Sequence, residues 1–312
     1  MVTSGRAVVG GIVILLVLTG AEPMVRWTGV LVGQETFRPR CGAGIHTDEG
    51  AGVIVLPQGG LFCPLVADPK AAHTFASYVR GSFATLADAD PDARTDIGAV
   101  GLGDSFGLLR LAASGDGDGM QVDVEGAIFA QFSLDTPSFD LINADYLVGL
   151  PVTVRLGGTT GRLRVYHQSS HLGDEFLLAR EPERINLSFE SLELIVSRET
   201  GALRVYAGSE HFFRRRPDDI AARLLHGGVE LRPGSMRTGR LVVALDVKIV
   251  DDADWQVAWS GRAGIEIARV PGPGHPPRML SLLGQFYDGP APYGQFYRDD
   301  IRYYGLGVHF SL

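Results

Sequence analysis

The final stretch of the chain, IRYYGLGVHFSL (residues 301–312), alternates along its whole length between large apolar residues and other types. Successive side chains of a β-strand point to opposite faces, so every second residue of this stretch shares a face. One face carries large apolar side chains: Tyr304, Leu306, Val308, Phe310 and Leu312. The opposite face carries polar, small or aromatic residues: Tyr303, Gly305, Gly307, His309 and Ser311. This pattern is typical of a membrane strand that presents one face to lipid and the other to a polar or narrow interior.

The same alternation recurs upstream, from about residue 73 onward. The stretch DYLVGLPVTVR (residues 145–155) places Tyr146, Val148 and Leu150 on one face and Asp145, Thr153 and Arg155 on the other. Clusters of Gly, Asp, Pro or Thr separate such runs, as turns separate strands. The sequence therefore predicts about twelve strands, at residues 73–82, 97–113, 119–133, 142–157, 160–170, 184–198, 201–211, 224–233, 239–250, 253–268, 278–288 and 300–312.

Two architectures suit an all-β chain of this kind: a closed antiparallel transmembrane β-barrel, or a soluble β-sandwich whose half-buried strands also alternate. Only closure removes unpaired strand edges in lipid, so membrane strands of this length indicate a barrel. Connections expected at the inner end are short near residues 116, 158 and 199, which is usual for outer-membrane barrels. Two connections depart from this rule, because residues 270–277 are long and the link near Asp252 is short. We predict a barrel domain at 73–312 with a small N-terminal segment.

The N-terminus has the features of a cleavable export signal. Arg6 precedes an apolar run at residues 7–18, and small residues follow near position 20. An uncleaved anchor is the alternative, but a membrane-spanning helix needs about 20 apolar residues. We therefore predict a signal peptide at 1–21, export to the outer membrane of a Gram-negative cell, and a periplasmic segment at 22–72. This segment plugs the lumen, covers the periplasmic mouth or adds a strand.

Export also bears on the two cysteines and on the partners of the chain. Cys41 and Cys63 would meet in an oxidising compartment, so we expect a disulfide rather than two free buried thiols. The net charge of −8 offers no basic field for a nucleic-acid backbone, so no nucleic-acid partner is expected. The expected partners are outer-membrane lipid, the outer-membrane assembly machinery and, in a homodimer, a second copy of the chain.

One cluster of residues has the types that catalysis uses. The stretch YHQSSHLGDEF (residues 166–176) directly follows GRLRV. His167 and Ser169 continue the face of Leu163 and Val165, so they face lipid if those two side chains do. Two residues along a strand span about 7 Å, within which an imidazole can reach a hydroxyl and act as its general base. The alternative is that polar side chains simply mark the end of a membrane strand.

Acyl transfer by such a pair needs a third group to orient the imidazole. The next predicted strand, ERINLSFESLEL, offers Asn186 and Glu190 for this role. Asp174 and Glu175, in the preceding loop, could hold a divalent cation such as calcium. Asn186 has the parity of Leu192 and Leu194, so it faces lipid only if these two leucines mark the lipid face.

Two resemblances are carried by these residues. The segments YHQSSHLGDEF, FCPLVADP and INADYLVG resemble those of the family called domain of unknown function 1207, which implies an exported β-rich protein without an established activity. The spacing of His167, Ser169, Ser170 and Asp174 is similar to the motif of the outer membrane phospholipase A family, and lipid A deacylase barrels have a related His-x-Ser pair. In that motif an asparagine usually follows the serine, where this chain has Ser170, and Asn186 lies further along than the motif's spacing.

The phospholipase resemblance implies Ser169 as nucleophile, His167 as base, Asn186 as orienting amide and Asp174 near calcium. The leading hypothesis is thus an ester hydrolase acting on phospholipid or lipopolysaccharide. A passive pore or structural barrel, whose lumen polarity is set by Asp145, Arg155 and Arg164, is the alternative. A soluble secreted binding protein is the third. The run HFFRRRPDD (residues 211–219) binds anionic lipid head groups or forms the hydrated base of a loop.

Overall fold

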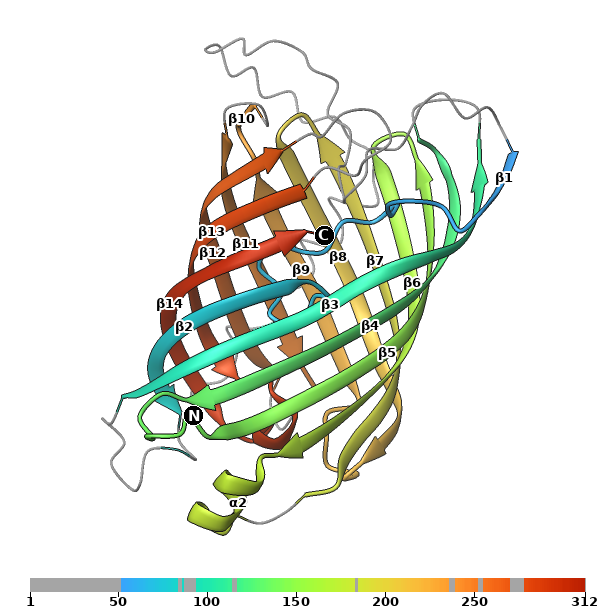
Figure 1. The fold of residues 1–312 in the computed structure, drawn as a ribbon. Helices are drawn as coiled ribbons and strands as arrows, with labels where there is room; N and C mark the ends of the chain where they lie inside the picture. The colour runs from blue at the N-terminus through green and yellow to red at the C-terminus, as the bar shows by residue number, and fades with distance from the viewer. Residues whose placement is uncertain are drawn as a thin grey trace, which may run out of the picture.

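The protein is a closed antiparallel β-barrel (Figure 1), described by a computed structural model for residues 52–83, 86, 94–113, 117–182, 185–235, 239–251, 255–269 and 278–311. The described residues form fourteen strands, of which twelve make the barrel wall and two, β1 (Gly52–Val55) and β10 (Gly234–Ser235), are short additions. No helix among them has the length and apolar composition to cross a membrane. The wall consists of β2 (Thr74–Phe83), β3 (Thr95–Ala112), β4 (Gly119–Ser133), β5 (Leu141–Leu156), β6 (Thr159–Leu172), β7 (Leu187–Thr200), β8 (Leu203–Arg216), β9 (Arg223–Leu231), β11 (Gly239–Val250), β12 (Gln256–Arg269), β13 (Arg278–Pro290) and β14 (Asp300–Ser311).

The ring closes between the first and last strands of the wall. Each wall strand pairs antiparallel with the wall strands before and after it, and β2 also pairs with β14, from Phe83↔Ile301 to Thr74↔Phe310. The predicted barrel of about twelve strands is therefore confirmed. Its predicted strand ranges mostly agree with the observed ones to within three residues, and β8, which runs five residues further than predicted, is the main difference.

Side chains alternate between an apolar outer surface and a polar interior. Leu163 and Val165 of β6 are each 45% exposed, whereas Arg162 and Arg164, which alternate with them, are buried inside the barrel. The arginines are neutralised there, because Glu193 of β7 accepts hydrogen bonds from Arg162 Nη2 at 2.7 Å and from Arg164 Nη2 at 2.6 Å. An apolar exterior around a paired polar interior is what a barrel in lipid requires.

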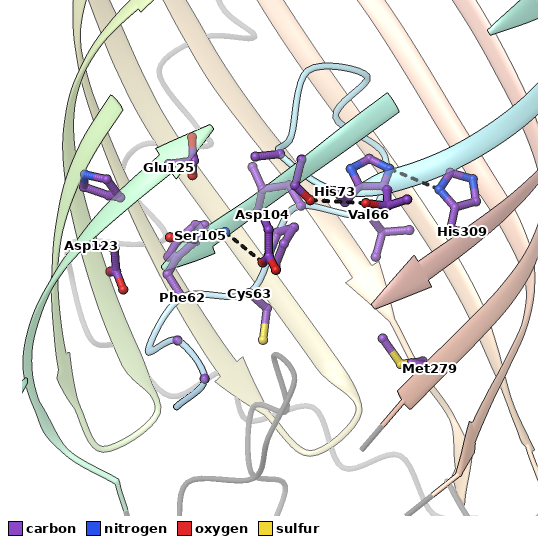
Figure 2. Close-up of a pocket in the computed structure, with 18 of the residues that line it drawn as sticks. Phe62, Cys63, Val66, His73, Asp104, Ser105, Asp123, Glu125, Met279 and His309 are labelled. Atoms are coloured by element: carbon purple, nitrogen blue, oxygen red, sulfur yellow. Dashed lines mark hydrogen bonds between the residues drawn. The ribbon is translucent and has the colours of Figure 1, made fainter. Parts of the chain in front are cut away.

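The described part of the N-terminal segment enters the barrel from its inner end. After β1, which pairs with the end of β3, residues 58–73 lie against inward-facing side chains of the wall. Figure 2 shows Phe62, Cys63 and Val66 of this segment inside the barrel, with Val66 beside His73. We call residues 58–73 the plug. Of the three roles open to the N-terminal segment, its described part both adds a short strand and fills the lumen.

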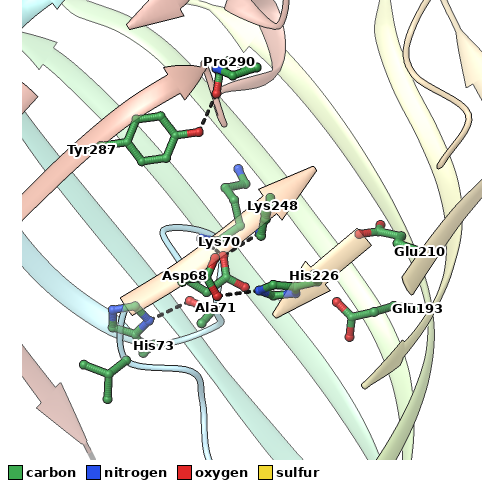
Figure 3. Close-up of polar contacts among 12 residues, drawn as sticks. Asp68, Lys70, Ala71, His73, Glu193, Glu210, His226, Lys248, Tyr287 and Pro290 are labelled. Carbon is green, nitrogen blue, oxygen red and sulfur yellow. Dashed lines mark hydrogen bonds and ion pairs between the residues drawn. The ribbon is translucent and has the colours of Figure 1, made fainter. Parts of the chain in front are cut away.

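Hydrogen bonds and ion pairs hold the plug. Arg204 and Arg262 donate to the backbone oxygens of Cys63 and Val66, at 3.1 Å and 2.7 Å. Lys248 Nζ lies 2.7 Å from Asp68 Oδ1, and Lys70 Nζ lies 2.6 Å from Asp145 Oδ2 (Figure 3 shows Asp68, Lys70 and Lys248). Ala67 and Leu65 are almost completely buried. The plug is therefore an integrated part of the interior.

Two expectations from the sequence fall outside the described residues. The predicted signal peptide at 1–21 and Cys41 belong to the part of the chain that the structure does not describe. Cys63 is disulfide-bonded, in agreement with the expected pairing of the two cysteines.

The outer end of the barrel carries the longer connections. The loop between β6 and β7 contains α2 (Asp174–Arg180), and the loop between β13 and β14 contains η2 (Gly294–Phe296), which folds over the lumen. The backbone N–H of Gly294 donates to Asp145 at 3.1 Å, and Gln295 Nε2 donates to the Ser170 oxygen at 2.9 Å. The lumen is thus covered at the outer end and plugged from the inner end.

Candidate functional site on the lipid-facing surface

The outer end of β6 carries a row of four side chains on its lipid-facing side. Leu163, Val165, His167 and Ser169 are exposed or half-buried, and the residues between them are buried. The side chain of His167 is 42% exposed. His167 and Ser169 therefore lie on the outer surface of the barrel. They directly follow Val165, the last exposed apolar residue of this row.

Glu190 of β7 is the candidate third group that contacts His167. The register of β6 and β7 places Glu190 directly opposite His167, and the Nδ1···Oε1 distance is 3.2 Å. Leu192 and Leu194 are 39% and 46% exposed, so they mark the outer face of β7, and Glu190 shares it. If Nδ1–H donates to this carboxylate, Nε2 keeps its lone pair and can accept the proton of a nucleophile.

Ser169 lies one row further toward the outer end. Ser188 of β7 is directly opposite it, and the register continues that of His167 and Glu190. Within the described part of the chain, the Ser169 hydroxyl makes no hydrogen bond, so nothing competes for its proton. The site thus places a hydroxyl, an imidazole and a carboxylate on the same outer face of β6 and β7, with a contact between His167 and Glu190 and, among the described residues, no hydrogen bond between Ser169 and His167.

Asn186, the other candidate for the third group, lies elsewhere. It precedes β7, whose first residue Leu187 is opposite Ser170, so Asn186 is level with His171. Four residues along the sheet correspond to about 13 Å from His167. Asn186 is exposed and lines a separate outer-end cavity of about 560 Å³ with Asp174 and Gln295. The structure does not bring it to the imidazole.

The proposed cation ligands are also apart from the site. Asp174 and Glu175 occupy the first turn of α2 and are exposed. The described residues include no group of three or more His, Cys, Asp and Glu side chains placed to hold a metal ion. A calcium site needs six to eight oxygen ligands, so these residues do not form one by themselves.

Arg214 of β8 lies in the run HFFRRRPDD, which the sequence predicts to bind anionic lipid head groups or to form the base of a loop, but the sequence does not place it beside Glu190. It pairs with Glu190 in the β7–β8 register, and its Nη1 lies 3.6 Å from Glu190 Oε1. A β-bulge between Glu190 and Ser191 shifts the register there. Because a bulge reverses the parity of the residues after it, alternation alone predicts the wrong face for Arg214.

A second cavity lies at the inner end, next to the plug. It has a volume of about 570 Å³ and is lined by plug residues, by Gly103 to Gly107 of β3 and by charged side chains such as Glu125, Arg162 and Arg232. Figure 2 shows His73 of the plug and His309 of β14 at its edge, with His73 Nε2 at 3.0 Å from His309 Nδ1. This cavity contains none of the residues proposed for catalysis.

Comparisons with known proteins agree with the fold. A family model described as "Protein of unknown function (DUF1207)" matches residues 44–312. Outer membrane phospholipase A from Escherichia coli is similar in structure, with a TM-score of 0.52 and 16% sequence identity over 81% of this chain and 94% of that one. No curated protein matches the sequence.

Two further structures of such phospholipases are similar to the same extent. An active-site asparagine-to-alanine mutant of the Escherichia coli enzyme has a TM-score of 0.53 and 15% identity, covering 81% of this chain and 94% of that one. The Salmonella typhi enzyme, a dimer with bound calcium, has a TM-score of 0.51 and 13% identity, covering 78% and 93%. At these identities the likeness shows the fold alone.

Proposed function

The chain belongs to the DUF1207 family of proteins of unknown function, and from the geometry of its outer surface we propose that it is a lipid ester hydrolase of the outer membrane. Ser169 is the nucleophile, His167 the general base, and Glu190 the group that orients the imidazole. The observation that carries this proposal is the 3.2 Å contact between His167 and Glu190, one row from Ser169 on the lipid-facing surface.

The reaction proceeds in two balanced steps. His167 Nε2 takes the Ser169 proton while the serine oxygen bonds to the ester carbonyl carbon. The carbon–oxygen bond to the alcohol then breaks, and the alcohol leaves with the proton from His167. In the second step water attacks the acyl-serine through the same base, which releases the fatty acid and restores Ser169. The Ser188 hydroxyl, opposite Ser169, can donate to the oxyanion that forms in each step.

The position of the site supports a lipid substrate. The row formed by His167 and Ser169 continues from Leu163 and Val165, so an acyl chain lying along the apolar wall reaches the serine with its ester end. The structurally similar proteins are by name outer membrane phospholipases, one of them a dimer with calcium. An outer-membrane location, a cleaved signal peptide and a homodimer are accordingly part of the proposal.

The orienting group proposed for this chain is an acid, whereas the active site of the Escherichia coli phospholipase includes an asparagine. Both side chains can accept a hydrogen bond from an imidazole Nδ1–H, but only the carboxylate is charged. The proposed unit is therefore serine, histidine and glutamate, an arrangement that also occurs in α/β-hydrolases.

The test is fatty-acid release by the full chain in mixed micelles of detergent and phospholipid. We expect Ser169→Ala to lower the rate by about 10³-fold or more, because the loss of any one residue of a nucleophile unit removes nearly all of the activity. Its folding cost is expected to stay within about 0.5 kcal/mol, because the side chain is small and half-buried. The predicted calcium at Asp174 and Glu175 is tested by running the assay with calcium and with a chelator.

The matched control is Ser209→Ala, an exposed serine of β8 opposite Leu194. It removes a hydroxyl at a position remote from His167 and is expected to keep full activity. Both variants must shift in gel migration on boiling, as a folded barrel does. If folded wild-type protein releases no fatty acid from phospholipid or lipopolysaccharide, or if Ser169→Ala is as active as Ser209→Ala, the proposed hydrolase is refuted.

A further inference from the structure

Two arginines of β8 are aligned with the two catalytic rows. The first row runs across three strands as His167, Glu190 and Arg214, and the second as Ser169, Ser188 and Arg216. Neighbouring strands are about 4.8 Å apart, so the Cα atoms of Ser169 and Arg216 are separated by about 10 Å. A long arginine side chain that leans toward β7 covers much of this distance.

The bulge in β8 places these arginines outside the barrel. Before the bulge Phe212 points inward and is 9% exposed. Phe213 and Arg214 both lie on the outer side, and Arg216 follows two residues later. Arg215, between them, points the other way and donates to the Ile220 oxygen at 2.8 Å. Without the extra residue, Arg214 and Arg216 would have the parity of Phe212 and face the interior.

Neither arginine is neutralised as the arginines of the interior are. Arg214 is 74% exposed, and its ion pair is the 3.6 Å approach to Glu190. In the part of the chain that the structure describes, Arg216 makes no hydrogen bond and no ion pair. Arginines at the end of a membrane strand can simply extend into water, but that reading does not explain a bulge that aligns both with the serine and the histidine.

A phosphate group matches this arrangement. A guanidinium presents a planar set of donors that fits phosphate in a two-point hydrogen bond. In a phosphorylated lipid the phosphate is a few bonds from the ester, so an ester at Ser169 brings the phosphate into the region between Ser188 and β8. We infer that Arg214 and Arg216 bind the phosphate of the lipid whose ester Ser169 attacks, an inference that rests on the proposed hydrolase.

Phosphate binding also acts on the catalytic carboxylate. Glu190 Oε1 is shared between His167 Nδ1, at 3.2 Å, and Arg214 Nη1, at 3.6 Å. A phosphate on Arg214 draws the guanidinium away from Glu190, which then accepts only from His167. A phosphorylated lipid therefore both docks beside the serine and completes the orientation of its base, whereas a neutral lipid does neither.

The kinetic test compares phosphatidylglycerol with diacylglycerol of the same acyl chains in mixed micelles. We expect Arg214→Ala/Arg216→Ala to lower kcat/KM for phosphatidylglycerol by about 10- to 100-fold, the range of lost charged hydrogen bonds. The rate on diacylglycerol is expected not to fall, because loss of Arg214 leaves Glu190 to accept from His167 alone. Arg214→Lys/Arg216→Lys keeps the charges but not the two-point hydrogen bonds. Its kcat/KM for phosphatidylglycerol is expected to lie between those of the wild type and the double alanine variant. Arg302→Ala removes a 70% exposed arginine of β14 and is the matched control.

A binding test separates this inference from the proposed hydrolase. Ser169→Ala protein in detergent is titrated calorimetrically with dihexanoyl phosphatidylglycerol, dihexanoylglycerol and inorganic phosphate. We expect binding of the first that the double Arg→Ala change weakens at least 10-fold, and weaker binding of the other two. If Ser169→Ala keeps activity while this binding pattern holds, only the hydrolase fails.

The inference is overturned by two results. One is equal binding of the phosphorylated and neutral lipids, or equal loss of activity on both in the arginine variant. The other is binding of inorganic phosphate as tight as that of the lipid, which would show recognition of free phosphate. Lipid A with and without its phosphates forms a further arm, and a preference for it over phosphatidylglycerol would identify the lipid that carries the phosphate.

Discussion

Glu190 is the residue on which the outer site depends. It lies on the outer face of the barrel between His167 and Arg214. A carboxylate at such a position loses hydration, which costs free energy unless the carboxylate is paired. An orienting acid holds the imidazole in the tautomer that leaves Nε2 free, and its loss acts on the rate rather than on substrate binding.

We therefore expect Glu190→Ala to lower kcat by about 100-fold or more with little change in KM, since the side chain orients the base without touching lipid. Glu190→Gln keeps a hydrogen-bond acceptor and is expected to retain more activity than Glu190→Ala. The measurement is fatty-acid release over a range of lipid concentrations. Asp218→Asn, at an exposed acid of the β8–β9 loop, is the control. A Glu190→Ala variant with wild-type kcat would remove Glu190 from the mechanism.

Tyr297 and Asp219 join two outer loops, and their titration is testable. Tyr297 donates to Asp219 Oδ1 at 2.8 Å, and partial burial together with this hydrogen bond raises the pKa of Tyr297 to about 12. Hydrogen bonds from Arg298 and Tyr297 lower the pKa of Asp219. The raised tyrosine pKa means that its contribution to stability is complete below pH 10 and is lost as the pH rises through about 12. The lowered aspartate pKa means that its contribution is lost only in acid.

The expected result is that Asp219→Asn makes Tyr297 ionise at lower pH, because a carboxylate no longer opposes the phenolate. Ultraviolet absorbance near 295 nm follows tyrosine ionisation, and Tyr297→Phe identifies the contribution of this side chain. If Asp219→Asn leaves the titration curve unchanged, the hydrogen bond does not set the pKa of Tyr297.

The sequence predicted which way His167, Ser169 and Glu190 point. Strict alternation along β6 and β7 means that these polar residues face the same side as the exposed leucines of their strands. The sequence did not decide whether Glu190 or Asn186 lies beside His167, because this depends on the register between β6 and β7. It included Arg214 in a run predicted to bind anionic head groups or to form a loop base, but did not place it beside Glu190, because a bulge leaves no mark in the pattern of apolar residues.

At the scale of elements, the strands were predictable and their pairing partly so. The ranges 119–133 and 239–250 agree with β4 and β11 residue for residue. The end of β8 was missed, because HFFRRR loses alternation at the bulge and was assigned to a loop. The path of residues 58–73 was not predictable, since it depends on single contacts such as Lys248 to Asp68, which involve residues distant in the sequence.

A substitution at Gly305 would test how tightly β2 and β14 are packed against each other. A Cβ at this position would lie 2.0 Å from the Tyr78 oxygen and 2.8 Å from the Val79 Cα, which are backbone atoms of the neighbouring strand. We expect Gly305→Ala to destabilise the barrel by about 1–3 kcal/mol, as overpacking does. The measurement is the temperature at which the compact band converts to the unfolded one on a gel.

Gly284→Ala is the matched control for that experiment. A Cβ there would lie 3.5 Å from the Ala263 oxygen, an ordinary contact. Its conversion temperature is expected to be close to that of the wild type. Equal conversion temperatures for the two variants would show that the seam can yield at Gly305.

For the molecule as a whole, the filled lumen bears on the pore alternative. Asp145, Arg155 and Arg164, which a pore would expose to water, are buried in ion pairs with Lys70, Glu199 and Glu193. The plug and the loop that contains η2 obstruct the lumen from its two ends. Passive diffusion through this barrel would require the plug to move.

We expect Asp68→Asn to loosen the plug, because the half-buried charge of Lys248 then loses its ion-pair partner. Conductance across planar lipid bilayers is expected to be low for the wild type and higher for the variant. Asp96→Asn breaks an exposed ion pair with Arg80 and should leave conductance low. A high conductance of the wild type would favour the pore.

The seam between β2 and β14 also sets the order in which the barrel can assemble. His73 and His309, which touch at its inner end, are 236 positions apart. Closing so long a loop costs chain entropy, and folding slows as contacts become less local. Until the last strand arrives, the sheet is an open sheet with two free edges and one apolar surface, and such sheets aggregate. Pairing of β14 with β2 is therefore the event that ends the vulnerable period of the chain, and a holdase that covers the unpaired strands until then would favour closure over aggregation.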